Sequence, residues 1–137
     1  MGSNATTSVT INQTPAAPSP GSNSTVCSGQ TLSLTSNTIA SATYNWSGPN
    51  SFTSSLEDPT IPSVTTAGAG TYSINATVSG CTSSTATTSV TINQTPSTPT
   101  AGSNTPICAG QTLSLTSNTI ASATYNWTGP NSFTSTL

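Results

Sequence analysis

The chain has 137 residues, contains no Lys, Arg or His, and carries two acidic side chains, Glu57 and Asp58, for a net charge of −2. Without Lys or Arg no group neutralises phosphates, so neither nucleic acids nor anionic membrane surfaces are expected as partners. Without His, Lys or Arg few side chains can perform acid–base catalysis, and we expect neither enzyme activity nor a cofactor.

The chain opens on a segment that it later repeats. The hexapeptide SVTINQ occupies residues 8–13 and again residues 89–94, and QTLSLTSNTIASATYNW begins both at Gln30 and at Gln111. Such self-similarity is typical of a tandem array. It predicts three parts in an array that extends beyond both ends: 1–15 as the tail of a preceding repeat, with residues 1–4 interpreted as a tag remnant, 16–96 as a complete repeat, and 97–137 as the first half of a following repeat.

The complete repeat alternates apolar and polar residues in short runs, over 31–35, 44–46, 72–78 and 90–92, separated by Gly- and Pro-containing breakers. This period of two is the pattern of half-buried strands. About seven short strands in a unit of this size predict an all-β sandwich. The side chains expected inside are Leu32, Leu34, Tyr44, Trp46, Ile61, Tyr72, Ile74, Val78 and Val90.

Two landmarks sharpen this prediction. Trp46 falls in the third strand, and Tyr72 precedes the sixth as in a tyrosine corner. The segments VCSGQTLSL, TYNWSGPNSFTS and AGTYSINATVSGC resemble the immunoglobulin-like or PKD-like repeats of large secreted bacterial surface proteins and adhesins. The resemblance implies immunoglobulin-like sandwiches in tandem and an extracellular location. In one departure from antibody-type domains, Ile74 stands where the second core cysteine would be expected.

The three cysteines are interpreted through the repeat. Cys27 and Cys81 lie 54 residues apart at the two ends of the complete repeat, which predicts a stabilising disulfide. Cys108 repeats Cys27, so its own partner would fall beyond the end of the chain. Two alternatives stay open: three free buried thiols, or a bond from Cys81 to Cys108 between neighbouring units. The spacing matches no metal site.

Sequons for N-linked sugar are frequent. Within the predicted strands, the sequon asparagines alternate with the apolar residues. They therefore lie on the face opposite the core, where a glycan would point outward. The candidate acceptors are Asn12, Asn23, Asn45, Asn75, Asn93 and Asn126. Two alternatives are that these polar side chains simply face water, or that sugar is O-linked to the Thr-rich segments.

The remaining chemical groups have structural explanations. Glu57 and Asp58 are adjacent in a turn before Pro59, and a solvated turn fits them better than a calcium site or a glycosidase pair. The aromatic side chains could form a sugar-binding platform, but their positions on the apolar face of the predicted strands favour the core. They are Tyr44, Trp46, Phe52 and Tyr72.

These observations predict a non-catalytic structural repeat of an extracellular fibre or adhesin stalk. The alternatives are a carbohydrate-binding module or a spacer domain of a large secreted protein. Partners would be neighbouring repeats or copies of the chain itself, with covalent glycans and no membrane span. Because a strand over 6–12 would replace only the last strand missing from 97–137, we expect a longer array or end-to-end contacts and not a complete donor-strand polymer.

Overall fold

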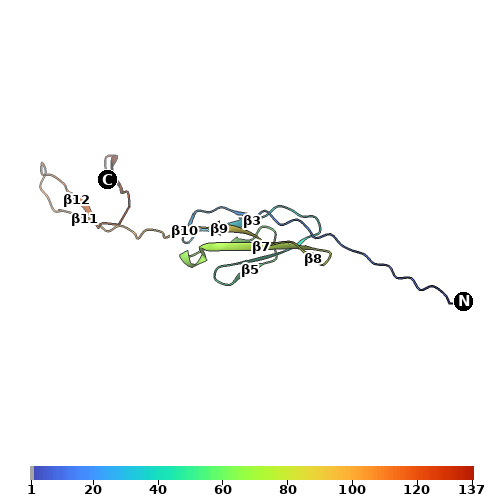
Figure 1. Cartoon of the computed structure of the whole chain (residues 1–137). Coiled ribbons are helices and arrows are strands. Elements are labelled where there is room, and N and C mark those ends of the chain that lie inside the picture. The colour runs from blue at the N-terminus through green and yellow to red at the C-terminus, as the bar shows by residue number, and fades with distance from the viewer. Residues whose placement is uncertain (1) are drawn as a thin grey trace. The chain divides into compact units, whose positions relative to one another are not determined.

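Alternating apolar residues of the complete repeat form two facing sheets (Figure 1). The computed structural model describes residues 2–137, and these sheets belong to the first of two compact units, which ends at Thr95. One sheet has the strand order β1 (Gly21–Ser22), β3 (Leu32–Thr35) and β6 (Thr60–Ile61). The other has the order β5 (Phe52–Ser54), β4 (Thr43–Gly48), β7 (Gly70–Val78) and β8 (Cys81–Thr82), and β9 (Ala86–Val90) also pairs with β7.

The two remaining strands of the unit, β2 (Val26–Cys27) and β10 (Ile92–Asn93), pair in parallel. The pairings within the two sheets are antiparallel. Antiparallel sheets packed face to face, with Trp46 buried on β4 and Tyr72 buried near the start of β7, are the arrangement of an immunoglobulin-like sandwich. The all-β sandwich predicted from the sequence is therefore confirmed.

The core differs from the predicted list at the ends of strands. Ile61 ends the two-residue β6 and Val78 ends β7, and both are half-buried instead of buried. The other seven predicted side chains are buried. The core also contains side chains that were not predicted: Val26, Val64, Ala76 and Ile92.

The hairpin between β7 and β8 fixes one end of the unit. Val78 pairs with Cys81, which leaves Ser79 and Gly80 as a two-residue turn. Their φ angles are 49° and 80°. Positive φ at both central residues is typical of the type I′ turn, whose twist matches that of the strands it joins. Cys81 is therefore held directly beside the last residue of β7.

The Tyr72 side chain fixes the opposite end of β7. Its hydroxyl donates a hydrogen bond of 2.9 Å to the carbonyl oxygen of Gly68, in the short 3-10 helix η1 (Thr66–Gly68). Its ring packs edge-on against Phe52, with 5.6 Å between centroids. A Cβ atom at Gly48 would come within 2.4 Å of the Tyr72 ring, so this close packing requires glycine at that position. The tyrosine corner predicted from the sequence is present.

Burial raises the pKa of the Tyr72 hydroxyl above its ordinary value of 10.0. The unfolded chain therefore loses this proton at a lower pH than the folded unit does. Ionisation of this group gives the free energy of unfolding no pH dependence below the unfolded pKa, and it makes that free energy decrease as the pH rises from about 10 towards the folded pKa. We expect the melting temperature of the wild-type unit to fall over that range.

The matched variant is Tyr72→Phe. It should lose about 1 kcal/mol at neutral pH with the missing hydrogen bond, and its melting temperature should depend less on alkaline pH than that of the wild type. Thermal unfolding followed by circular dichroism from about pH 8 to about pH 11 measures both effects. Parallel pH dependence in the two proteins would contradict the assignment.

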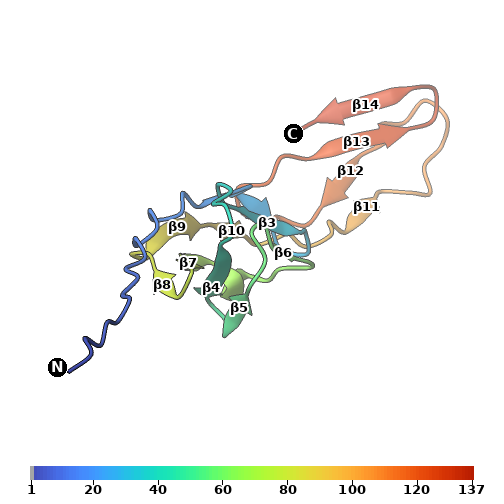
Figure 2. The same ribbon diagram turned by 90° about the vertical axis from the view of Figure 1, so that its right-hand side faces the viewer.

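The second unit, Pro96–Leu137, contains two separate antiparallel strand pairs (Figure 2). β11 (Ala101–Ser103) pairs with β12 (Leu115–Ser117), and β13 (Asn126–Gly129) pairs with β14 (Phe133–Thr136). β12 and β13 thus begin two residues later than the strands that they repeat, β3 and β4.

Identical side chains have different environments in the two units. Leu113 and Leu115 are 54% and 40% exposed, whereas Leu32 and Leu34, which they repeat, are completely buried. In the complete unit, β6 pairs with β3, and β7 closes the opposite sheet over the same core. Counterparts of β6 and β7 are absent from residues 96–137, which explains the exposure.

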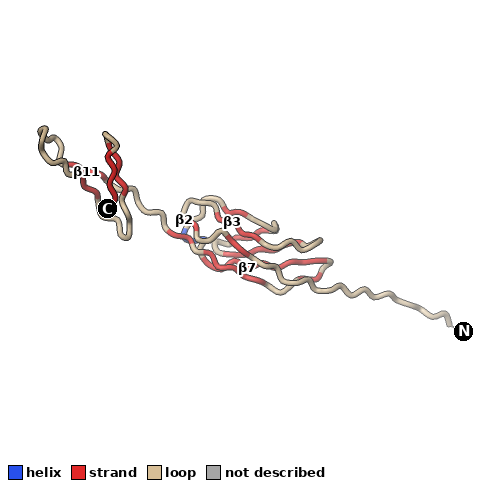
Figure 3. The backbone as a smooth tube through the Cα atoms, turned by 90° about the horizontal axis from the view of Figure 1, so that it is seen from above, coloured by secondary structure: helices blue, strands red, loops and turns tan. Residues whose placement is uncertain are grey.

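The N-terminal segment likewise lacks a partner within the described chain. Residues 2–20 form no strand (Figure 3), so the prediction of a strand over 6–12 is wrong for this structure. Val9 and Ile11 are 78% and 90% exposed. Val90 and Ile92, which repeat them, are 4% and 6% exposed. The difference follows from pairing, because β9 and β10 have neighbouring strands and the N-terminal segment has none.

Across residues 2–137, no helix is both long enough and apolar enough to cross a membrane.

Candidate functional site

The chain reaches the complete unit at the end where β7 turns into β8, which we name the hairpin pole (Ser79–Cys81). The side-chain amide of Asn12 donates a hydrogen bond of 3.0 Å to the carbonyl oxygen of Ser79. The sulfur of Cys81 lies 3.5 Å from the backbone carbonyl oxygen of Asn12. These are long-range contacts between residues 67 and 69 positions apart, so they attach the incoming segment to one defined place on the unit.

The chain leaves the same unit at the other end, which we name the β10 pole (β2 and β10). Asn93 pairs with Cys27, and the backbone N–H of Ser28 donates a hydrogen bond of 2.8 Å to the carbonyl oxygen of Asn93. The hydroxyl of Thr95 donates to the carbonyl oxygen of Ser28 at 2.7 Å. The outgoing chain is thus held by hydrogen bonds to the unit, as the incoming chain is.

The two poles lie at opposite ends of β7. Cys81 is beside Val78, the last residue of β7, whereas Val90 is opposite Gly70, the first residue, and leads into β10. Nine residues of strand at about 3.3 Å each separate these ends by roughly 26 Å. The unit therefore receives the chain at one end of its long strand and releases it at the other.

This separation corrects the predicted disulfide. Cys27 lies at the β10 pole and Cys81 at the hairpin pole, and both are free. A disulfide requires Cα atoms within about 7 Å of each other, so these two cysteines of one unit cannot bond. Cys108 is also free in the described chain. The alternative of three buried thiols is wrong too, because Cys27 and Cys108 are exposed and Cys81 is half-buried.

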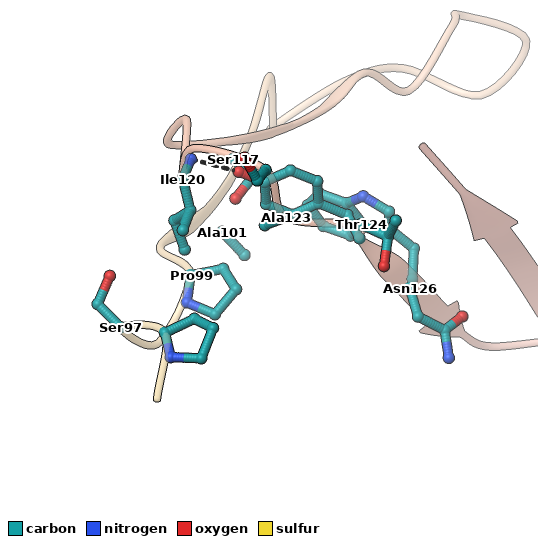
Figure 4. Close-up of a pocket in the computed structure, with 12 residues that line it drawn as sticks. Ser97, Pro99, Ala101, Ser117, Ile120, Ala123, Thr124 and Asn126 are labelled. Atoms are coloured by element: carbon teal, nitrogen blue, oxygen red, sulfur yellow. Dashed lines mark hydrogen bonds between the residues drawn. The ribbon is translucent and has the colours of Figure 1, made fainter. Parts of the chain in front are cut away.

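Two hollows in the second unit have apolar walls. One is lined by Pro99, Ile120 and Tyr125, among others, with the Tyr125 hydroxyl accepting a hydrogen bond of 2.6 Å from the Ile120 backbone (Figure 4). The other is lined by Leu113, Trp127 and neighbouring residues. In the complete unit the side chains that these residues repeat line the filled core. The hollows are therefore uncovered core surface and not built ligand sites.

The two carboxylates have structural roles. Glu57 accepts a hydrogen bond from the hydroxyl of Thr38, and Asp58 accepts one of 2.8 Å from the backbone N–H of Ser36. The backbone carbonyl of Glu57 also accepts a hydrogen bond of 3.2 Å from the Trp46 indole. Within residues 2–137, no group of three or more His, Cys, Asp or Glu side chains could hold a metal ion.

The aromatic side chains of the complete unit do not form an exposed platform. Trp46, Tyr72 and Tyr44 are buried, and Phe52 is half-buried against Tyr72. The Tyr44 hydroxyl is occupied by the backbone, since it donates to Asn37 at 3.0 Å. This arrangement counts against a carbohydrate-binding surface on the complete unit.

The candidate sequons differ in how free their side chains are. Asn45 and Asn93 are exposed, and Asn75 is half-exposed directly opposite Asn45 on the outer face of the sheet. Asn23 is engaged at both ends of its amide, donating to Thr31 at 3.1 Å and accepting from Ser33 at 2.8 Å. This pair of hydrogen bonds gives the Asn23 side chain a structural role that needs no glycan. The equivalent pair is formed by Asn104, which repeats Asn23.

Two further candidates lie outside this sheet. Asn126 is exposed at the start of β13, and Asn12 is engaged at the hairpin pole. The sequon at Asn12 predicts only a glycan acceptor and does not indicate its part in the attachment of the incoming chain. A signal was available, because Asn12 repeats Asn93 and both would lie at a boundary between repeats.

Neither a protein-family model nor a curated protein matches this chain. Among solved structures, the chain is similar to one in the complex described as Dpr2 Ig1-Ig2 with DIP-Theta Ig1-Ig3, at a TM-score of 0.38 and 16% identity. The match covers 64% of this chain and 35% of that one, so this chain spans about a third of its length. The immunoglobulin-like fold assigned here follows from the strand order, the buried Trp46 and the hydrogen bond from Tyr72 to Gly68.

Proposed function

We propose that this chain is a non-catalytic structural repeat of an extracellular fibre or adhesin stalk, of the type found in large secreted bacterial surface proteins. The observation that carries the proposal is the position of the two poles. The incoming chain contacts the complete unit at Ser79 and Cys81, and the outgoing chain is held at Cys27 and Ser28. Units connected in this way add length along their long strands.

The connections between units support the same role. Short Pro-containing segments, residues 15–20 and 96–99, flank the complete repeat. Pro-rich connectors are stiffer than Gly/Ser tethers and hold their ends apart. The closed core of the complete unit combined with a stiff connector suits a spacer that bears tension, and it would suit a spacer domain of a large secreted protein equally well.

The chemistry of the chain supports a passive role. It has no Lys, Arg or His, and both carboxylates bond to neighbouring residues of the fold. A carbohydrate-binding module would need exposed aromatic side chains, but those of the complete unit are buried. We therefore prefer the structural repeat to that alternative.

An extracellular surface almost without charge needs another source of solubility, because low net charge promotes association. Covalent sugar would supply it. Asn45, Asn75 and Asn93 are the best-placed acceptors, since none donates a hydrogen bond from its side chain to another part of the described chain and all point away from the core. Because Asn45 and Asn75 are opposite each other, a glycan on one would crowd a glycan on the other.

Immunogold electron microscopy tests the proposal. Antibodies raised against the folded chain, applied to cells of the organism that makes it, should label extended structures on the cell surface at several points along their length. Labelling should persist in a reducing agent, because the proposed role depends on folded units in series. Gold confined to the cell interior, or bound only to compact particles, would contradict an extracellular fibre or stalk.

A further inference from the structure

The strands near the two ends of the complete unit are paired with each other. β2 lies near the start of the unit and β10 at its end, and both run in parallel towards the β10 pole. The incoming chain is attached at the hairpin pole, whereas the outgoing chain leaves from the β10 pole. Tension along the chain therefore pulls β2 towards the hairpin pole and β10 away from it, so the two strands are drawn past each other lengthwise.

We propose that the β2–β10 pair is the contact that withstands tension on the complete unit. The hydrogen bonds of a strand pair run between its strands, so sliding one strand along the other loads all of these bonds at once. In a hairpin such as that of β7 and β8, the free ends lie side by side, and pulling them apart would break the bonds one after another. The inference rests on the proposed fibre role and adds the residues that carry the force.

Backbone hydrogen bonds and buried side chains hold the pair together. The backbone N–H of Val26 donates to the carbonyl oxygen of Thr91 at 3.3 Å, and that of Ser28 donates to the carbonyl oxygen of Asn93 at 2.8 Å. The side chains of Val26 and Ile92 are buried in the core. Separating the strands therefore breaks hydrogen bonds and exposes apolar surface in the same step.

Two side-chain hydrogen bonds extend the pair beyond its strands. The hydroxyl of Ser24 accepts a hydrogen bond of 2.9 Å from the backbone N–H of Thr91. The hydroxyl of Thr95 donates one of 2.7 Å to the carbonyl oxygen of Ser28. Ser24 precedes β2 and Thr95 follows β10, so the contact extends over residues 24–28 and 91–95. Each hydroxyl can be removed without changing the backbone, which makes the contribution of the pair measurable.

Force can pull out either end of the unit, and both routes break this pair. One route removes the segment that contains β1 and β2, which also breaks the pairing of β1 with β3 and the hydrogen bonds of Asn23 to Thr31 and Ser33. The other route removes the segment that contains β9 and β10, which also breaks the pairing of β9 with β7. Because the β2–β10 pair is common to both routes, it adds to the barrier whichever end moves first.

Other hydrogen bonds of the unit lie outside both routes. Ser83 is buried, and its hydroxyl accepts a hydrogen bond of 3.0 Å from the backbone N–H of Ala76. Neither residue belongs to a segment that slides out, so this bond stays intact while either end is pulled free. Removing the Ser83 hydroxyl leaves a buried N–H group unpaired and lowers the equilibrium stability. Ser83→Ala is therefore a matched control that destabilises the unit away from the path of the force.

Magnetic tweezers that hold the full chain at constant force test the proposal. Handles are attached to the two termini, and a reducing buffer keeps the free thiols from linking molecules. Unfolding of the complete unit is the largest single increase in length, because this unit contains most of the paired strands. Ser24→Ala and Thr95→Val should each unfold about fivefold faster than the wild type at the same force, the factor that corresponds to about 1 kcal/mol for one lost hydrogen bond. The double variant should unfold roughly 25-fold faster.

The control separates resistance to force from overall stability. Ser83→Ala should unfold under force at the wild-type rate, although guanidinium unfolding without force should find it at least as destabilised as the other two single variants. The proposal is overturned if Ser24→Ala and Thr95→Val withstand force as long as the wild type, or if Ser83→Ala unfolds under force as fast as they do. Neither result touches the fibre role, whose own test is the location of the chain on the cell.

Discussion

Replacing Trp46 with alanine is expected to destabilise the complete unit by about 3–5 kcal/mol. Trp46 is completely buried between the two sheets, and its indole N–H donates to the carbonyl oxygen of Glu57. The substitution would therefore leave both a cavity and an unpaired carbonyl. A domain of this size has a total stability of about 4–12 kcal/mol, so the variant should be unfolded or close to it at room temperature.

The chain supplies its own control for this experiment. Trp127 occupies the equivalent place in the second unit, on β13, but its surroundings are open. Trp127→Ala should therefore leave the unfolding of the complete unit unchanged. Guanidinium unfolding followed by circular dichroism measures both variants, and in Trp127→Ala the fluorescence of Trp46 reports on the complete unit alone. Equal destabilisation by the two substitutions would show that the units fold as one.

The core was predictable because the alternation of apolar residues directly encodes which face of a strand is buried. Trp46, Tyr72 and the two leucines of β3 are all at the expected parity and are all buried. Ile61 and Val78 have the correct parity too, but each ends its strand, where burial depends on what crosses above it. The alternation of apolar residues predicts which face of a strand a side chain lies on. It cannot predict how far along that strand the opposite sheet extends.

The cysteines show what spacing cannot predict. A separation of 54 residues is compatible with a disulfide only if the topology returns the chain to the same end of the sandwich. Here β7 carries the chain from one pole to the other, and the hairpin leaves Cys81 at the far pole from Cys27. Only the register of the strands reveals this.

The contacts of Asn12 were hidden for a related reason. The alternation of Asn12 with the apolar residues around it indicates only that its side chain faces away from a core. Its partners, Ser79 and Cys81, belong to a different repeat from the strand that Asn12 copies. Contacts across a boundary between repeats depend on how one unit ends and the next begins. Self-similarity locates that boundary but does not describe its geometry.

Hydrogen exchange should differ sharply between two nearly identical segments. Residues 30–52 and 111–133 differ only at Ser47 and Thr128, so their intrinsic exchange rates are nearly the same. In the complete unit, β4 lies between β5 and β7, whereas β13 pairs with β14 alone. Isolated strand pairs are marginally stable, so amides of β13 should exchange about a thousandfold faster than those of β4, which open only when the unit unfolds.

Mass spectrometry can separate the two segments, because peptides that contain Ser47 or Thr128 differ by one methylene group. The measurement should be made on dilute, reduced protein, so that contacts between copies do not protect the second unit. Fast exchange around Trp127 beside slow exchange around Trp46 would show that burial by β6, β7 and β9 creates the stability of the fold, because local sequence is the same in both. Equal protection would mean that the half-repeat is stable by itself, and the exposed leucines would then need another explanation.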